Sequence, residues 1–261
     1  MGFSNENTAA HHLYTILCQI RDSGENAYSA GWVHVLDAEW GSPEFARRHT
    51  EVVTLLQLTL RSLNALPERS RVRSERYVNG WWVAVMQPVA NWSDINRPAQ
   101  GVISQEDLDQ LESTAELISG NLMGSDAAPR SGNLDEIAKQ CKEWLDLLQS
   151  MSESEISGPV RDELISQIKH LIWLIEHVDL FGGARVAGEA TSVIGSIAQI
   201  STTLANVEPE TASRWKKGFL TLLAACVFFN QAVPIVQESI STGSDMVKEI
   251  TAVVERVQGN E

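Results

Sequence analysis

Cysteine is scarce in this sequence, and the motifs that would mark a metal or catalytic centre are missing. The 261 residues include three cysteines, Cys18, Cys141 and Cys226, which lie far apart. Because no CxxC or Cys/His spacing occurs, neither a zinc site nor a disulfide framework is expected. The sequence also contains no HExxH motif and no GxSxG elbow. These absences exclude a recognisable zinc protease or hydrolase nucleophile, and we predict no cofactor.

Basic residues are also few. Lysine and arginine total 20 against 34 acidic residues, so the net charge is −14. The first 123 residues contain nine arginines and no lysine against fifteen acidic residues. An acidic surface of this kind repels phosphate backbones, which disfavours nucleic acid as a partner. It also disfavours anionic lipid, except at the cationic residues 214–217.

The sequence lacks any alternating strand pattern, and almost every segment repeats its apolar residues with a period of 3.6. We therefore predict an all-α fold, a multi-helix bundle or array of about eight to ten helices with a hydrophobic C-terminal helical hairpin. The small residues, glycine and proline of 123–133 favour a linker. This linker separates an N-terminal helical domain, residues 1–123, from a C-terminal helical domain, residues 134–261.

A shared helical register predicts the core of the N-terminal domain. One of its helices has a clear start signal at Ser42, Pro43 and Glu44, which combine a capping hydroxyl, a proline in the first turn and an acidic residue. Apolar residues recur at helical spacing in this helix and in two others, as expected for faces that pack together. The predicted core residues are Leu13, Leu17, Val52, Leu56, Leu60, Leu108, Leu111 and Ile118.

The most apolar charge-free run covers residues 218–236. A second uncharged stretch, residues 190–207, precedes it, and a charged bend at 208–217 joins the two. Two uncharged helices joined by a charged bend predict a helical hairpin over residues 190–236. The side chains expected to pack in this hairpin are Phe219, Leu222, Leu223, Cys226 and Phe229.

Two interpretations of the hairpin stay open. Asn230, Gln231 and Pro234 interrupt its apolar run, and this favours a core helix of a bundle, because polar groups in hydrocarbon need partners. The alternative is membrane association through residues 214–236. Cationic residues at one end of an apolar run are typical of an interfacial anchor.

Residues 69–76 contain the densest group of cationic side chains. The group comprises Arg69, Arg71, Arg73 and Arg76. Guanidinium forks suit carboxylates and phosphates, so this group predicts a binding site for an acidic partner. The alternative is a solvated helical turn with local ion pairs, given the overall acidity of the chain.

Tryptophan is frequent, with eight residues. Trp81 and Trp82 cannot both face the same core, because neighbouring residues on a helix point about 100° apart. We predict that Trp82, or Trp92 in the following loop, is exposed and anchors a partner. The alternative is that flanking helices cover these side chains.

Histidines offer one candidate for a metal or acid–base site. His34, Asp37 and Glu39 lie close enough in sequence to gather around one ion. Short polar turns often do so by chance, so this turn is a minor alternative. His170 and His177 are two helical turns apart, too far to share an ion, and they predict a solvated face. We therefore expect no metal and assign no catalytic residue.

The sequence as a whole predicts a non-enzymatic helical module for protein–protein interaction, with a protein as the expected partner. A bacterial conflict or immunity system is a hypothetical context for it. The first alternative is a membrane-associated or membrane-inserting effector that uses residues 190–236, and the second is an enzyme with an unrecognised site. The first residues show no basic start followed by an apolar core, so we expect no secretory signal and a cytoplasmic location, with membrane association in the first alternative. The oligomeric state stays open.

Overall fold

The structure is a computed structural model that describes residues 8–86, 94, 96–121, 131–202, 204, 207 and 209–231. The regular secondary structure of these residues is helical, and none of them forms a β-strand. The all-α fold predicted from the helical periodicity is therefore confirmed. The chain divides into two compact units, each with its own core.

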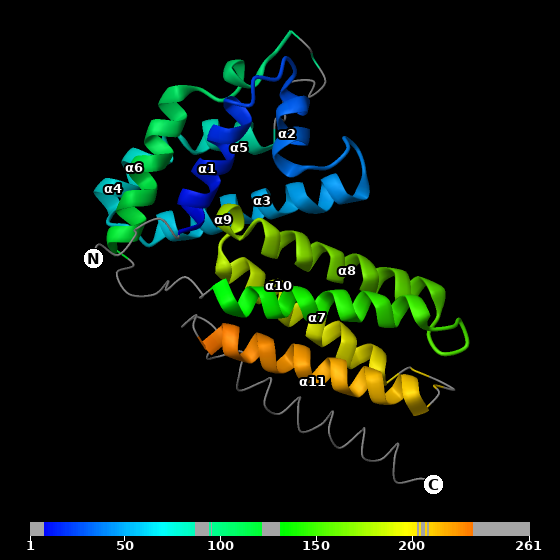
Figure 1. Cartoon of the computed structure of the whole chain (residues 1–261). Coiled ribbons are helices and arrows are strands. Elements are labelled where there is room, and N and C mark those ends of the chain that lie inside the picture. Colours follow the sequence, from blue (N-terminus) through cyan, green and yellow to red (C-terminus); the bar gives the residue numbers. More distant parts are fainter. Residues whose placement is uncertain are drawn as a thin grey trace. The chain divides into compact units, whose positions relative to one another are not determined.

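The first unit comprises residues 1–124 and 179–182. Its helices are α1 (Ala9–Arg21), α2 (Tyr28–Leu36), α3 (Pro43–Asn64), α4 (Glu68–Glu75), α5 (Val78–Met86) and α6 (Gln105–Asn121), with the 3-10 turn η1 (Ala99–Gly101) before α6. Helix α1 packs against α2, α3 and α6, and Figure 1 shows it with α6 on one side and α2 on the other. Helix α3 also contacts α4, α5 and α6. Helix α1 is therefore central to this unit.

Most of the residues predicted for the core of the first unit are buried. Those that are buried are Leu13, Leu17, Val52, Leu56, Leu108, Leu111 and Ile118. Leu60 is only half-buried, because α3 turns this side chain toward the edge of the packed face. Ser42 caps α3 as expected, and its hydroxyl accepts a hydrogen bond of 3.0 Å from the backbone N–H of Phe45.

The short segment 179–182 lies in the first unit, although the sequence placed it in the C-terminal domain. It contains most of helix α9 (Val178–Phe181). Gly182 has a φ of 81°, and a Cβ at this position would lie 2.7 Å from Nε2 of His12. Only glycine combines this left-handed backbone with so close an approach. This contact between Gly182 and His12 explains why residues 179–182 belong to the unit of α1. The spacing of residues along the sequence does not reveal it.

The second unit comprises residues 125–178 and 183–261. Its long helices are α7 (Ser131–Ser150), α8 (Gly158–Glu176), α10 (Gly183–Ser201) and α11 (Pro209–Gln231). Helix α7 contacts α8 and α11, and α10 contacts the same two helices, so the four form a closed ring, as in a four-helix bundle (Figure 1). Buried residues of this bundle include Ile137, Cys141, Trp144, Leu148, Leu164, Ile168, Leu171, Val186, Val193, Ile197 and Leu222.

Helix α11 carries the first part of the apolar run. Phe219, Leu222 and Cys226 are buried and Leu223 is half-buried, while the side chain of Phe229 lies outside the described residues. The charged bend expected at 208–217 is wrong for most of its length. Helix α11 already begins at Pro209, because proline is well suited to the first turn of a helix.

The cationic residues 214–217 therefore form part of the helix. Trp215 is buried, while Arg214, Lys216 and Lys217 are exposed. This alternation follows from the helical period, which turns one residue inward and its neighbours outward. Residues 232–236, the end of the predicted hairpin, lie outside the described residues. Among the helices of the described residues, none is both long enough and apolar enough to span a membrane.

Candidate interaction site on helix α4

Helix α4 is held to the first unit by a small number of inward contacts. Leu66, just before the helix, joins a buried cluster with Leu63, Ala10, Ala115 and Ile118, and Val78 after the helix packs against this cluster. Within the helix, Ser74 is buried, and its hydroxyl accepts a hydrogen bond of 2.9 Å from the hydroxyl of Thr114 on α6. These contacts fix one face of α4 and leave the opposite face to solvent.

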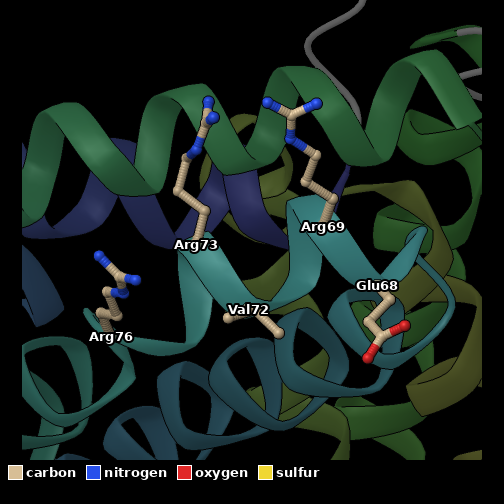
Figure 2. A pocket seen from close by; sticks show the side chains of 5 residues that line it. All are labelled: Glu68, Arg69, Val72, Arg73 and Arg76. Atoms are coloured by element: carbon tan, nitrogen blue, oxygen red, sulfur yellow. The ribbon is translucent and has the colours of Figure 1, made fainter.

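The outward face of α4 and its C-cap carry three of the four predicted arginines. Arg69, Arg73 and Arg76 line a hollow of about 510 Å³ together with Glu68 and Val72. All five side chains are exposed, and Val72 is exposed to 44% although it is apolar. Figure 2 shows Arg69 and Arg73 leaving the helix in the same direction, with Arg76 beyond its end. We call Arg69, Val72, Arg73 and Arg76 the arginine face.

The spacing of the arginine face follows the helical repeat. Arg73 lies four residues after Arg69, and Arg76 lies three residues after Arg73. At a rise of 1.5 Å per residue, the backbone positions of the three arginines are separated by about 6 and 4.5 Å along the helix axis. Val72 shares this repeat, three residues after Arg69. Val72 was not predicted as part of the site, although its spacing from Arg69 places it on the same face.

The four predicted arginines differ in their electrostatic partners. The guanidinium Nε of Arg71 lies 3.3 Å from a carboxylate oxygen of Glu75, and Arg71 is half-buried. Arg69, Arg73 and Arg76 form no ion pair with other residues that the structure describes. With Glu68, the hollow therefore has three positive groups and one negative group, a net charge of +2 in a chain of net charge −14. Unpaired guanidinium groups can bind carboxylates through two parallel hydrogen bonds.

The predicted tryptophan anchors are not part of this hollow. Trp82 is 42% exposed on α5, as the spacing of Trp81 and Trp82 predicted, but it is not among the residues that line the hollow. Trp81 is buried, and its indole N–H donates a hydrogen bond of 2.9 Å to the backbone carbonyl of Asp107. Trp92 lies outside the described residues. Trp82 therefore offers a separate exposed aromatic surface.

The side chains of the turn around His34 do not converge on one position. His34, Asp37 and Glu39 are all exposed, and the nearest ionic contact of Asp37 is with Arg48 at 4.0 Å. The ligand atoms of these three side chains do not converge in the described structure. The geometry of this turn therefore does not support the hypothesis of a metal or acid–base site there.

The solvated face predicted for the histidines of α8 is wrong. His170 is buried and stacks on Trp173, with ring centroids 5.8 Å apart and planes inclined by 14°. His177, the C-cap of α8, stacks on the same indole, with centroids 4.6 Å apart. Its Nδ1 atom lies 2.9 Å from the backbone carbonyl of Trp173. His170 is thus removed from solvent and His177 is half-buried, and sequence spacing does not show their stacking on Trp173.

No protein-family model, curated protein or solved structure matches this chain. Its own geometry defines its class: the regular structure of the described residues is helical, and the arginine face is exposed, with no ion pair to other described residues, in a chain of net charge −14.

Proposed function

We propose that this protein is a non-enzymatic interaction module that binds an acidic segment of a partner protein through the arginine face. The observation that carries the proposal is the group of three exposed arginines, Arg69, Arg73 and Arg76, which have no ionic partner in the described chain and line one hollow. Exposed guanidinium groups of this kind are solvated in the free protein. A partner that carries carboxylates supplies the negative charge that these three arginines lack among the described residues.

The pattern of the arginine face supports a peptide over a nucleic acid. Three cations on one short helix and its C-cap provide few phosphate contacts, whereas strong nucleic-acid binding draws on many. The net charge of −14 repels a phosphate polymer over the rest of the surface. A peptide with Glu or Asp at every third or fourth residue matches the spacing of the arginines, and Val72 offers it an apolar contact.

The proposal predicts a selective loss of binding when the three arginines are replaced together. The probe is a fluorescein-labelled peptide in which Glu recurs every third or fourth residue, and binding is followed by fluorescence anisotropy. R69Q/R73Q/R76Q is expected to raise Kd by about thirtyfold, since three exposed pairs at roughly 0.7 kcal/mol each contribute about 2 kcal/mol. The interaction should also weaken as salt is raised, because screening acts on exposed charges.

Arg71 supplies the matched control on the same helix. It is already paired with Glu75, so R71Q is expected to change Kd by less than about threefold. A peptide with Gln in place of Glu should not bind. Equal losses for R71Q and the triple variant, or tight binding by the triple variant, would contradict the arginine face as the site. Circular dichroism of each variant checks that its helical content is unchanged.

A second candidate function is membrane association through the predicted hairpin of residues 190–236. Leu220 supports it, because this apolar side chain is 47% exposed on α11 beside the exposed cations Lys216 and Lys217. Cationic and apolar groups on one helix face suit a membrane interface. The buried residues Phe219, Leu222 and Cys226 favour the alternative packing inside the bundle.

Liposome flotation distinguishes these two functions. With vesicles of phosphatidylcholine and phosphatidylserine, we expect the unmodified protein to stay in the lipid-free fraction, because burial of the apolar face of α11 competes with lipid. The double substitution N230L/Q231L removes two polar groups and is expected to shift the protein toward the vesicles. If the unmodified protein floats and resists a carbonate wash, membrane association takes the place of the interaction module.

A further inference from the structure

A second hollow lies in the other unit, between α7 and α11, and has no part in the proposed interaction. Its volume is about 490 Å³, within the range of pockets that hold small organic molecules. Trp144 and Leu147 form its apolar part, and both are buried. Gly218 lies on the α11 side. We call this hollow the α7–α11 groove.

The indole N–H of Trp144 is a buried donor without an acceptor in the described part of the chain. Trp144 is 1% exposed and packs edge-to-face against Trp215, with ring centroids 4.7 Å apart. The N–H of Trp215 is satisfied, since it donates to the hydroxyl of Ser201 at 2.8 Å. Buried donors of folded proteins are normally paired, so the Trp144 N–H marks a position where an acceptor is missing.

Gly218 brings the backbone of α11 close to this indole. A Cβ on residue 218 would lie 3.3 Å from the indole nitrogen and 3.2 Å from the neighbouring ring carbon Cε2 of Trp144. Any larger residue would therefore press on the indole ring or push α11 away. Glycine lets α11 approach the indole of Trp144, which lines the groove.

Some of the charged side chains around the groove also have no ionic partner among the described residues. Among the acids, Glu136 accepts a hydrogen bond of 2.9 Å from the amide of Gln140, and Glu143 lies 4.0 Å from the ammonium of Lys139. On α11, Arg214 and Lys217 are exposed and have no ionic partner within the described residues. The cations and acids that line the groove are equal in number, but they lie on different helices: Arg214 and Lys217 on α11, and Glu136, Glu143 and Asp146 on α7. The α11 side therefore offers two cations to an anion, and the buried N–H of Trp144 lacks an acceptor.

We infer that the α7–α11 groove binds a small organic monocarboxylate. One carboxylate oxygen accepts from the Trp144 N–H, and the negative charge pairs with Arg214 and Lys217. The apolar body of the ligand rests against Trp144 and Leu147. A carboxylate suits the site better than a phosphate, because the acids Glu136, Glu143 and Asp146 on the α7 wall repel a dianion more strongly than a monoanion.

The test follows the indole N–H resonances of ¹⁵N-labelled protein by NMR, with benzoate as the probe. W144F identifies the Trp144 signal by its disappearance. In the unmodified protein, millimolar benzoate is expected to move this signal downfield, as a new hydrogen bond to the N–H does, while the signal of Trp81 stays in place. Benzamide, which has the same ring without the charge, should produce a shift at least about tenfold weaker at equal concentration.

Substitutions in α11 define the site. R214A/K217A removes two exposed side chains and is expected to raise the Kd for benzoate at least about tenfold. K216A removes the neighbouring exposed cation that does not line the groove, and Kd should change by less than about twofold. G218A adds a methyl group against the indole ring of Trp144 and should reduce the benzoate-induced shift.

The inference is wrong if millimolar benzoate leaves the Trp144 signal unmoved in the folded protein. It is also wrong if K216A weakens binding as much as R214A/K217A, or if inorganic phosphate moves the signal and benzoate does not. None of these measurements involves α4, so failure here leaves the proposed interaction of the arginine face untouched.

Discussion

Replacing Leu56 with Ala is expected to lower the free energy of unfolding by about 2–5 kcal/mol. Leu56 is 3% exposed on α3, the helix that packs against α1 and contacts α4, α5 and α6. The substitution removes apolar atoms from a packed interior and leaves a cavity that the surrounding helices fill only in part. Chemical denaturation followed by circular dichroism measures the loss as a lower midpoint at unchanged slope.

Leu58 provides the matched control two residues further along the same helix. Its side chain is 38% exposed, so Leu58→Ala makes the same chemical change at a solvent-exposed position. We expect this variant to stay within about 0.5 kcal/mol of the unmodified protein. If both substitutions lower the midpoint equally, the packed face of α3 has been placed wrongly.

Acidification from pH 7 to pH 5 is expected to destabilise the first unit through two histidines. Burial lowers the pKa of His12 and of His49 below their ordinary value of 6.5. His12 is 6% exposed, and His49 packs against Trp32 with ring centroids 4.9 Å apart. Both side chains therefore stay neutral in the folded protein over a range in which the unfolded chain takes up protons.

The sign of the effect follows from this difference in proton uptake. Above about pH 6.5 neither state binds these protons, and the stability is complete. Below that value the unfolded state binds more protons, so the free energy of unfolding falls by at most about 1.4 kcal/mol per histidine for each pH unit. The loss levels off once pH drops below the folded pKa values. Two histidines together give a slope of up to about 2.7 kcal/mol per unit.

The variant H12Q/H49Q should flatten this dependence between pH 7 and pH 5, because glutamine does not titrate. The amide of the glutamine at position 49 can still reach the backbone carbonyl of Val85, which lies 2.9 Å from Nε2 of His49. H34Q, at an exposed position, is the control and should keep the slope of the unmodified protein. Denaturation midpoints at three pH values measure the slopes. An unchanged slope in H12Q/H49Q would mean that other groups set the acid sensitivity.

The helices were predictable because their signals are local. Ser42 and Pro43 combine a capping hydroxyl with a proline that needs no N–H partner, and the structure begins α3 at Pro43. The buried positions Leu13, Leu17 and Leu56 followed from the 3.6-residue period alone. The charged bend before residue 218 was mispredicted for the converse reason, since a cluster of charges does not stop a helix whose apolar face continues through Trp215.

The candidate sites were only partly predictable. The sequence showed four arginines between residues 69 and 76, but only the structure separates Arg71, which is paired with Glu75, from the three that line the hollow. The α7–α11 groove had no sequence signal, because Trp144 and Gly218 are far apart in the chain and meet only when α7 packs on α11. Which hydrogen bonds are left unmade depends on such distant contacts.

The sequence by itself determined the all-helical class, the net negative charge and most of the buried face of the first unit, because period and capping act over a few residues and charge is set by composition. The tertiary structure alone decided that residues 179–182 join the unit of α1, that His170 leaves solvent and that Trp144 has no acceptor among the described residues. These outcomes depend on which helices approach one another and how closely, and residues distant in the chain set that approach.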